Sequence, residues 1–115
     1  MEEISFTKLR EILKEDKLGI ESTITIENAR LCAVTKIGNQ RFVSEYEGKL
    51  TISRDWGTHY YVRGDPTPQG RFEYSFPQFY ATDEGRETLA RGSTPTANVE
   101  VQLESAGPGM KIFYE

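Results

Sequence analysis

The chain has 115 residues, of which 37% are hydrophobic, 28% are charged and 11% are aromatic. This length allows one hydrophobic core, and this composition is far from that of disordered chains, so we predict a single globular domain over residues 1–115. The formal net charge of −4, from 14 Lys and Arg against 18 Asp and Glu, disfavours a protein that binds nucleic acid through an extended basic face.

No targeting or metal-binding signal is apparent in the sequence. The N-terminal segment MEEISFTK lacks the basic start and apolar run of a signal peptide, and no apolar run reaches the ~20 residues that span a bilayer. Cys32 is the only cysteine, which excludes an intramolecular disulfide and a cysteine-rich zinc site. We therefore expect a cytoplasmic protein with no membrane partner, no metal and no cofactor.

The first predicted element is an amphipathic helix near the N-terminus. Ser5 can cap it, Ile4 and Leu9 occupy the positions of a hydrophobic staple, and Gly19 is placed to end it. One side carries apolar residues at helical spacing, namely Phe6, Leu9, Ile12 and Leu13, and the other carries charges that face solvent, namely Lys8, Glu11, Lys14 and Glu15. We expect the apolar side to lie on a sheet.

From residue 22 onward the hydrophobic period changes to two. Apolar and polar residues alternate over 23–27, 49–53, 71–76 and 98–103, which is typical of antiparallel strands with one buried face. Three glycine-containing pairs suit tight hairpin turns, so residues 31–63 are predicted to form a four-stranded meander. These pairs are Gly38-Asn39, Glu47-Gly48 and Trp56-Gly57.

Three further segments complete the predicted fold. Residues 64–70, GDPTPQG, are expected to form an exposed loop, and residues 82–91 a short second helix capped by Thr82 or Asp83. The chain is expected to close with a hairpin in which SAGPG joins ANVEVQL to MKIFY. The fold class is therefore α+β, an antiparallel meander sheet of seven or eight strands packed by the N-terminal helix.

The turns fix a register for the meander. If each turn is a two-residue loop, Ile37 pairs with Gln40, Tyr46 with Lys49, and Asp55 with Thr58. One face of the sheet then carries three rows of side chains, of which the second is apolar and the third cationic. The rows are Cys32, Glu45, Leu50 and Arg63; Val34, Val43, Ile52 and Tyr61; and Lys36, Arg41, Arg54 and His59.

The last hairpin allows a second arrangement. If residues 55–57 form a three-residue loop, the following strand flips, so that His59 and Tyr61 leave these rows while Tyr60 and Val62 enter the core face. Both arrangements remain open at this point.

The cationic row leads to the first functional hypothesis. Like charges on neighbouring strands repel, so the row needs either carboxylates of the protein itself or an anionic ligand such as a phosphate or nucleotide. Trp56 and Tyr61 would offer stacking surfaces to a base. The residues predicted to bind such a ligand are Lys36, Arg41, Arg54, Trp56, His59, Tyr61 and Arg63.

The aromatic residues lead to the second hypothesis, which is contact with another protein. In the register above, Leu31, Phe42 and Tyr46 share the second face of the sheet with Tyr60, and an exposed apolar patch of this kind marks a partner or homodimer interface. The chain would then be a small acidic adaptor or inhibitor of the type that phages and mobile elements encode.

Catalysis is not predicted. A nucleophile pair would have to join Cys32 to His59, which the register separates by two rows. The sequence also lacks a Gly-x-Ser-x-Gly elbow, a phosphate-binding loop and a dinucleotide-type glycine pattern. We therefore predict a binding protein rather than an enzyme.

Overall fold

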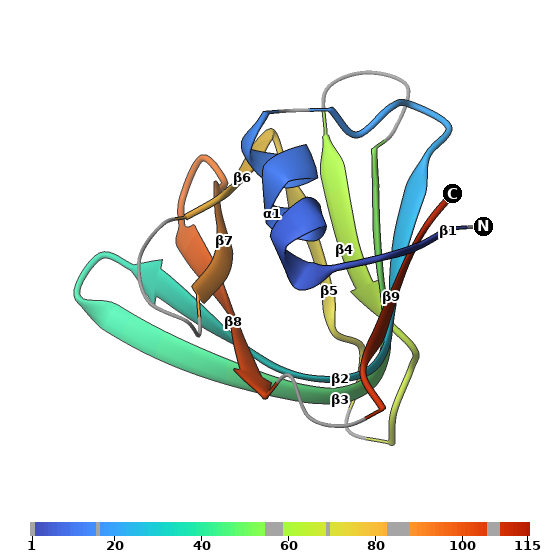
Figure 1. Cartoon of the computed structure of the whole chain (residues 1–115). Helices are drawn as coiled ribbons and strands as arrows, with labels where there is room; N and C mark the ends of the chain where they lie inside the picture. The colour runs from blue at the N-terminus through green and yellow to red at the C-terminus, as the bar shows by residue number, and fades with distance from the viewer. Residues whose placement is uncertain (1, 16, 55–58, 69, 83–87, 106–108) are drawn as a thin grey trace.

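A computed structural model of the chain describes residues 2–15, 17–54, 59–68, 70–82, 88–105 and 109–115. Within these residues the protein is one antiparallel sheet of nine strands with one helix (Figure 1), which confirms the predicted α+β fold class. The elements in chain order are β1 (Glu2–Ile4), α1 (Phe6–Lys14), β2 (Thr23–Ile37), β3 (Gln40–Arg54), β4 (Tyr60–Gly64), β5 (Glu73–Phe76), β6 (Gln78–Ala81), β7 (Thr88–Ser93), β8 (Asn98–Ser105) and β9 (Lys111–Tyr114).

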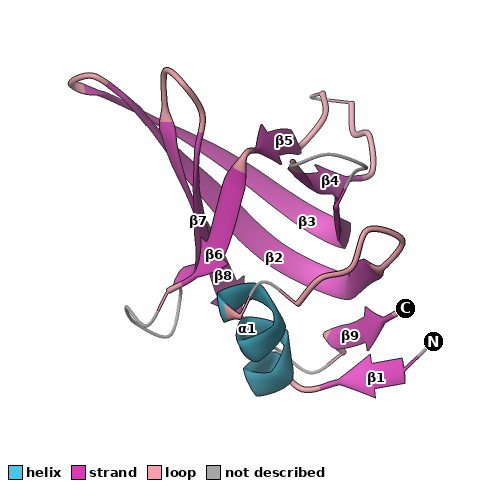
Figure 2. Ribbon diagram, turned by 90° about the horizontal axis from the view of Figure 1, so that it is seen from above, coloured by secondary structure: helices cyan, strands magenta, loops and turns pink. Residues whose placement is uncertain are grey.

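The sheet curls around the helix. Its strand order is β5-β4-β3-β2-β8-β7-β6, so β5 and β6 lie at its two edges, yet only Pro77 separates them in the chain. The two edges must therefore come together, and Figures 1 and 2 show α1 enclosed on the concave side of the resulting cup. The core lies between α1 and this concave face, and its largest fully buried side chains include Leu9, Ile24, Ile26, Leu50, Ile52, Val62, Phe76 and Val101.

The helix forms where the sequence predicts it. Ser5 is its N-cap and its hydroxyl accepts a hydrogen bond from the amide of Lys8 at 3.1 Å. The helix ends at Lys14, earlier than the predicted stop at Gly19. The residues that precede the cap, Glu2–Ile4, form β1, a strand that the sequence analysis did not predict and that pairs with β9.

The predicted turn at Glu47-Gly48 is wrong. β2 and β3 are continuous strands of 15 residues each that pair along their whole length, with one register irregularity between Ile26 and Ala29. Gly48, with φ of 140°, lies opposite Ala29 at this irregularity. The extra residue of this bulge is in β2, where Glu27 and Asn28 face Lys49 alone and Asn28 has φ of 57°. The glycine with positive φ thus accompanies a bulge in the neighbouring strand rather than a turn. The pairing of Tyr46 with Lys49 is consequently wrong, and residues 31–63 contribute to three strands rather than four.

The predicted C-terminal hairpin is also wrong. β8 and β9 do not pair with each other, since both pair antiparallel with β2, β8 beside Arg30–Lys36 and β9 beside Ile24–Glu27. The predicted SAGPG connection includes residues 106–108, which lie outside the described residues. Asn28, at the bulge of β2, donates a side-chain hydrogen bond to the carbonyl oxygen of Gly109 at 2.8 Å.

The predictions for the two hairpins that flank β3 differ in their outcome. Ile37 lies opposite Gln40 around the Gly38-Asn39 turn, as predicted. Residues 55–58, including the Trp56-Gly57 turn, lie outside the described residues, but the ladder beyond them places Ile52 opposite Val62. The even-numbered residues of β4 therefore share the core face of the sheet with Ile52. This is the facing of the flipped arrangement, and Tyr60 and Val62 are buried.

The predicted second helix over residues 82–91 is wrong in its C-terminal part. Residues 83–87 lie outside the described residues, whereas Thr88–Ser93 form β7 rather than a helix. β7 pairs with β6 and β8, and Leu89 and Ala90 are fully buried. Burial between two neighbouring strands therefore overrides the local helix signal.

Candidate functional site

The predicted cationic row is divided between the two ends of the sheet. Lys36 lies opposite Arg41 near the tip of the β2–β3 hairpin, as the register predicts, and both side chains are exposed. Arg54 lies at the other end of β3, where it is opposite Tyr60. The side-by-side placement of Arg41, Arg54 and His59 is therefore wrong, because β3 is one extended strand and does not fold back at Gly48.

The remaining predicted ligand-binding residues do not gather around Arg54. Trp56 lies outside the described residues, and His59 is half-buried just before β4. Tyr61 and Arg63 lie on the face of β4 opposite to Tyr60. The guanidinium carbon of Arg63 is 4.6 Å from the centre of the Tyr61 ring, and its Nε is 3.3 Å from a carboxylate oxygen of Glu73. A carboxylate of the protein thus balances the charge of Arg63.

The predicted aromatic patch is core rather than surface. Leu31, Tyr46 and Tyr60 are buried, and of the four residues proposed for an interface only Phe42 is exposed. The ring of Tyr46 stacks on that of Phe72 with centroids 5.4 Å apart. The exposed-patch prediction failed because the curled sheet covers this face with its own later strands.

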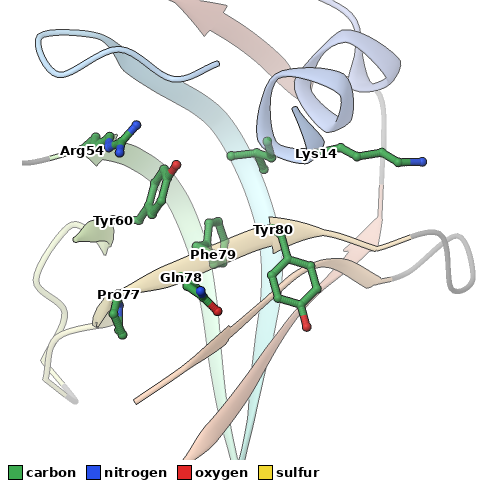
Figure 3. A pocket seen from close by; sticks show the side chains of 8 residues that line it. Lys14, Arg54, Tyr60, Pro77, Gln78, Phe79 and Tyr80 are labelled. Carbon is green, nitrogen blue, oxygen red and sulfur yellow. The ribbon is translucent and has the colours of Figure 1, made fainter. Parts of the chain in front are cut away.

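A cavity of about 490 Å³ opens where α1, the end of β3 and β6 meet (Figure 3). This volume is within the range of small-molecule sites. Figure 3 shows Arg54 and Tyr60 on one side of the cavity, β6 with Phe79 and Tyr80 along its floor, and Lys14 on the other side with its side chain directed away from Arg54. The lining residues are Leu13, Lys14, Arg54, Tyr60, Pro77, Gln78, Phe79 and Tyr80.

The charged groups among the described residues that line this cavity are two cations, Arg54 and Lys14. Arg54 is half-buried with its Nε buried, and its guanidinium carbon lies 5.3 Å from the centre of the Tyr60 ring. This cation–π contact orients the guanidinium at the edge of the cavity. Lys14 is the second cation, and none of the described lining residues is acidic.

Most of these lining residues were not predicted as a site. Of the eight, only Arg54 and Tyr60 carried a predicted functional role, ligand binding for Arg54 and interface contact for Tyr60. Lys14 belongs to the charged side of the helix, where it resembles any solvated lysine. Phe79 and Tyr80 lie close to Arg54 only because the edges of the sheet meet at Pro77, and no local pattern signals that closure.

The described part of the chain contains no assembled pair of nucleophile and base and no cluster of metal ligands. Cys32 is buried on β2 opposite Glu45 and its thiol donates to the side-chain oxygen of Gln102 at 3.3 Å. Glu45 and Arg54 are nine residues apart on β3, or about 30 Å of extended strand, so Cys32 and His59 are not neighbours. No three His, Cys, Asp or Glu residues among those described are grouped so that they could hold a metal ion.

A second polar cluster lies on the outer face of the sheet. A carboxylate oxygen of Glu100 accepts hydrogen bonds from the Thr88 hydroxyl at 2.7 Å and from the Gln102 amide at 3.1 Å, and Arg91 lies 3.4 Å from the other oxygen. The Thr88 bond, followed by the Gln102 bond and the nearby positive charge, lowers the pKa of Glu100. Because these partners belong to β7 and β8, the cluster joins strands and is a structural feature.

Comparisons of the chain with protein-family models, with curated proteins and with solved structures find no significant match. None of the described residues forms a helix with the length and apolarity needed to cross a membrane.

Proposed function

We propose that this protein is a small non-enzymatic binding module that captures an anionic small molecule, such as a nucleotide, in the cavity between α1, β3 and β6. The observation that supports this proposal is the composition of the cavity, where Arg54 and Lys14 combine with aromatic walls. Anion-binding sites combine apolar surface with a few cationic groups.

The two cations contribute unequally. A guanidinium is planar and can donate two parallel hydrogen bonds to a phosphate or carboxylate, so Arg54 is the main anion-binding group. Lys14 occupies the last turn of α1, where the helix end carries partial negative charge, and its ammonium partly offsets that charge.

The aromatic residues supply the apolar part of the site. Tyr60 and Phe79 are buried, with ring centroids 6.3 Å apart, whereas Tyr80 is exposed. A flat base or other ring can stack on such side chains without hydrogen-bond specificity. A nucleotide can use both the cationic and the aromatic lining of the cavity, because its phosphate can bind near Arg54 while its base stacks near Tyr80.

The test is a thermal-unfolding screen with inorganic phosphate and with nucleoside mono- and diphosphates. A ligand at roughly 100 times its Kd adds about 2.7 kcal/mol to the free energy of unfolding, which raises Tm measurably. We expect Arg54→Gln to abolish this shift and Lys14→Gln to reduce it.

The matched control is Arg41→Gln, which removes the same charge at the far end of β3 and should leave the shift unchanged. If Arg41→Gln removes the shift and Arg54→Gln does not, the anion binds at the hairpin tip instead. A wild-type protein that gives no shift with any of these anions at millimolar concentration would exclude the proposed function.

A further inference from the structure

No described strand pairs with the outer edge of β3 over its first ten residues, and a cavity of about 220 Å³ lies between Ser44–Tyr46 and the loop residues Thr67 and Gly70–Phe72. β4 pairs only with residues Leu50–Arg54, so we call the edge over residues 40–49 the open edge. Phe42 and Val43 on this segment are each 50% exposed. Figures 1 and 2 show the tip of the β2–β3 hairpin projecting from the sheet, so the segment is accessible to a second strand.

The hairpin determines which backbone groups are unpaired. The residues that flank a two-residue turn form a hydrogen-bonded pair, in this case Ile37 and Gln40, and hydrogen-bonded pairs then alternate along the ladder. Phe42 therefore directs its amide and carbonyl toward β2. Arg41, Val43 and Glu45 direct theirs toward the open edge, where they can serve another strand.

We propose that this edge binds the same edge of a second copy of the chain, antiparallel, about a two-fold axis at Val43. In this register Val43 pairs with Val43 of the second copy, and Arg41 pairs with Glu45 of the second copy. All three residues direct their backbone groups toward the open edge, so the pairing continues the hydrogen-bond ladder of the sheet. The dimer would be one continuous sheet that runs through both protomers.

Charge complementarity favours this register over its neighbours. The two-fold axis creates two Arg41–Glu45 pairs, one on each side of an apolar Val43 pair, and opposite charges directly across a ladder are stabilising. A shift to either adjacent register that keeps the backbone groups paired places a charged residue, Arg41 or Glu45, opposite Val43. The register centred on Ser44 pairs Arg41 with Glu47 but sets Val43 against Glu45, so the register centred on Val43 is the one that combines an apolar pair with two opposite-charge pairs.

The segment lacks two of the features with which proteins protect a strand edge, and its charges are of both signs. Edge strands are commonly blocked by Lys, Pro or a bulge. The sequence QRFVSEYE, residues 40–47, contains neither Lys nor Pro, and the register irregularity of the β2–β3 pair lies beyond it, between Ile26–Ala29 and Gly48–Leu50. The open segment is thus suited to pairing, and the inference does not depend on the proposed ligand.

The test measures the mass of the protein by sedimentation equilibrium over a range of concentrations. Wild type is expected to form a dimer. Arg41→Glu and Glu45→Arg should each raise the dimer Kd about tenfold or more, because each replaces two attractive pairs by two repulsive ones. Arg41→Glu also places a carboxylate opposite Lys36 within its own chain, so it is not expected to harm folding.

The decisive step is to mix the two single variants. A heterodimer of Arg41→Glu with Glu45→Arg restores both opposite-charge pairs, and the double variant restores them in a homodimer. Lys8→Glu changes the net charge equally on the exposed side of α1 and should leave the dimer intact.

A backbone variant tests the strand pairing separately from charge. Val43→Pro removes an amide that points toward the open edge and is therefore compatible with the β2–β3 ladder, while it removes one hydrogen bond from each side of the axis. We expect a folded monomer. A wild-type protein that is monomeric at its highest soluble concentration, or a dimer that none of these variants weakens, would overturn the proposal.

Discussion

Glu100 is a half-buried carboxylate whose charge is stabilised by hydrogen bonds rather than by exposure to water. The Thr88 hydroxyl is the largest cause of its lowered pKa, followed by the Gln102 amide. The usual value of such a carboxyl is 4.5, so the stabilisation is fully present above that pH and is lost as the pH falls toward the lower pKa of the folded state. Acid should therefore weaken the connection between β7 and β8.

This argument predicts a pH-dependent effect for Glu100→Gln. At neutral pH the variant should lower the free energy of unfolding by about 1 kcal/mol or less, since the group is partly screened by solvent. The difference from wild type should shrink as the pH falls below 4.5. Urea unfolding at several pH values measures it, and the exposed Glu21→Gln provides the control. A difference that stays constant down to acid pH would contradict the proposed role of the charge.

At the bend of the β2–β3 pair, Gly48 of β3 and Asn28 of β2 both have positive φ. Gly48 has φ of 140°, which a residue with a Cβ adopts only with strain. A Cβ at this position would also approach the Tyr46 hydroxyl oxygen to 3.0 Å, and that hydroxyl donates to Lys49 and accepts from the amide of Asp65. Conformation and packing thus both require glycine at the bend of the strand.

We therefore expect Gly48→Ala to lower the free energy of unfolding by about 1–3 kcal/mol. Chemical denaturation measures the loss, and Ser44→Ala, an exposed change on the same strand, should stay within about 0.5 kcal/mol of wild type. If Gly48→Ala were as stable as wild type, the bend would not require a glycine conformation.

The molecule as a whole is held closed by contacts between strands that are distant in the sheet order. Phe76, the last residue of β5, is fully buried and stacks on Phe79 of β6 with ring centroids 5.2 Å apart. Its ring also covers Gly92 of β7, where an added Cβ would lie 2.3 Å from a ring carbon. This contact across Pro77 brings the two edges of the sheet together and forms one wall of the cavity.

The closure predicts that Gly92→Ala is destabilising by about 1–3 kcal/mol, because the buried Phe76 ring has no space into which it can move. Thermal unfolding measures the effect. Gly19→Ala is the control, since a Cβ there meets only the small Ser22 side chain, whose hydroxyl oxygen lies at 3.2 Å, and no ring or backbone atom. Equal stability of the two variants would show that Phe76 is not tightly packed against β7.

The sequence was sufficient for features that depend on neighbouring residues. The Ser5 cap, the apolar side of α1, the alternation of the strands and the Gly38-Asn39 turn all follow from local sterics and periodicity, and the structure confirms them. Because that turn fixes the register beside it, the sequence also placed Arg41 opposite Lys36.

Local sequence patterns could not predict three other features. These are the bend at Gly48, the separation of β8 from β9, and the cavity beside Arg54. A glycine with positive φ serves a turn or a bulge equally well, so the choice depends on which strand lies opposite, and that depends on long-range burial. Likewise, Lys14, Arg54 and Tyr80 belong to distant parts of the chain. They line one cavity because the sheet closes at Pro77 around α1, and that closure is a property of the packed core rather than of any segment.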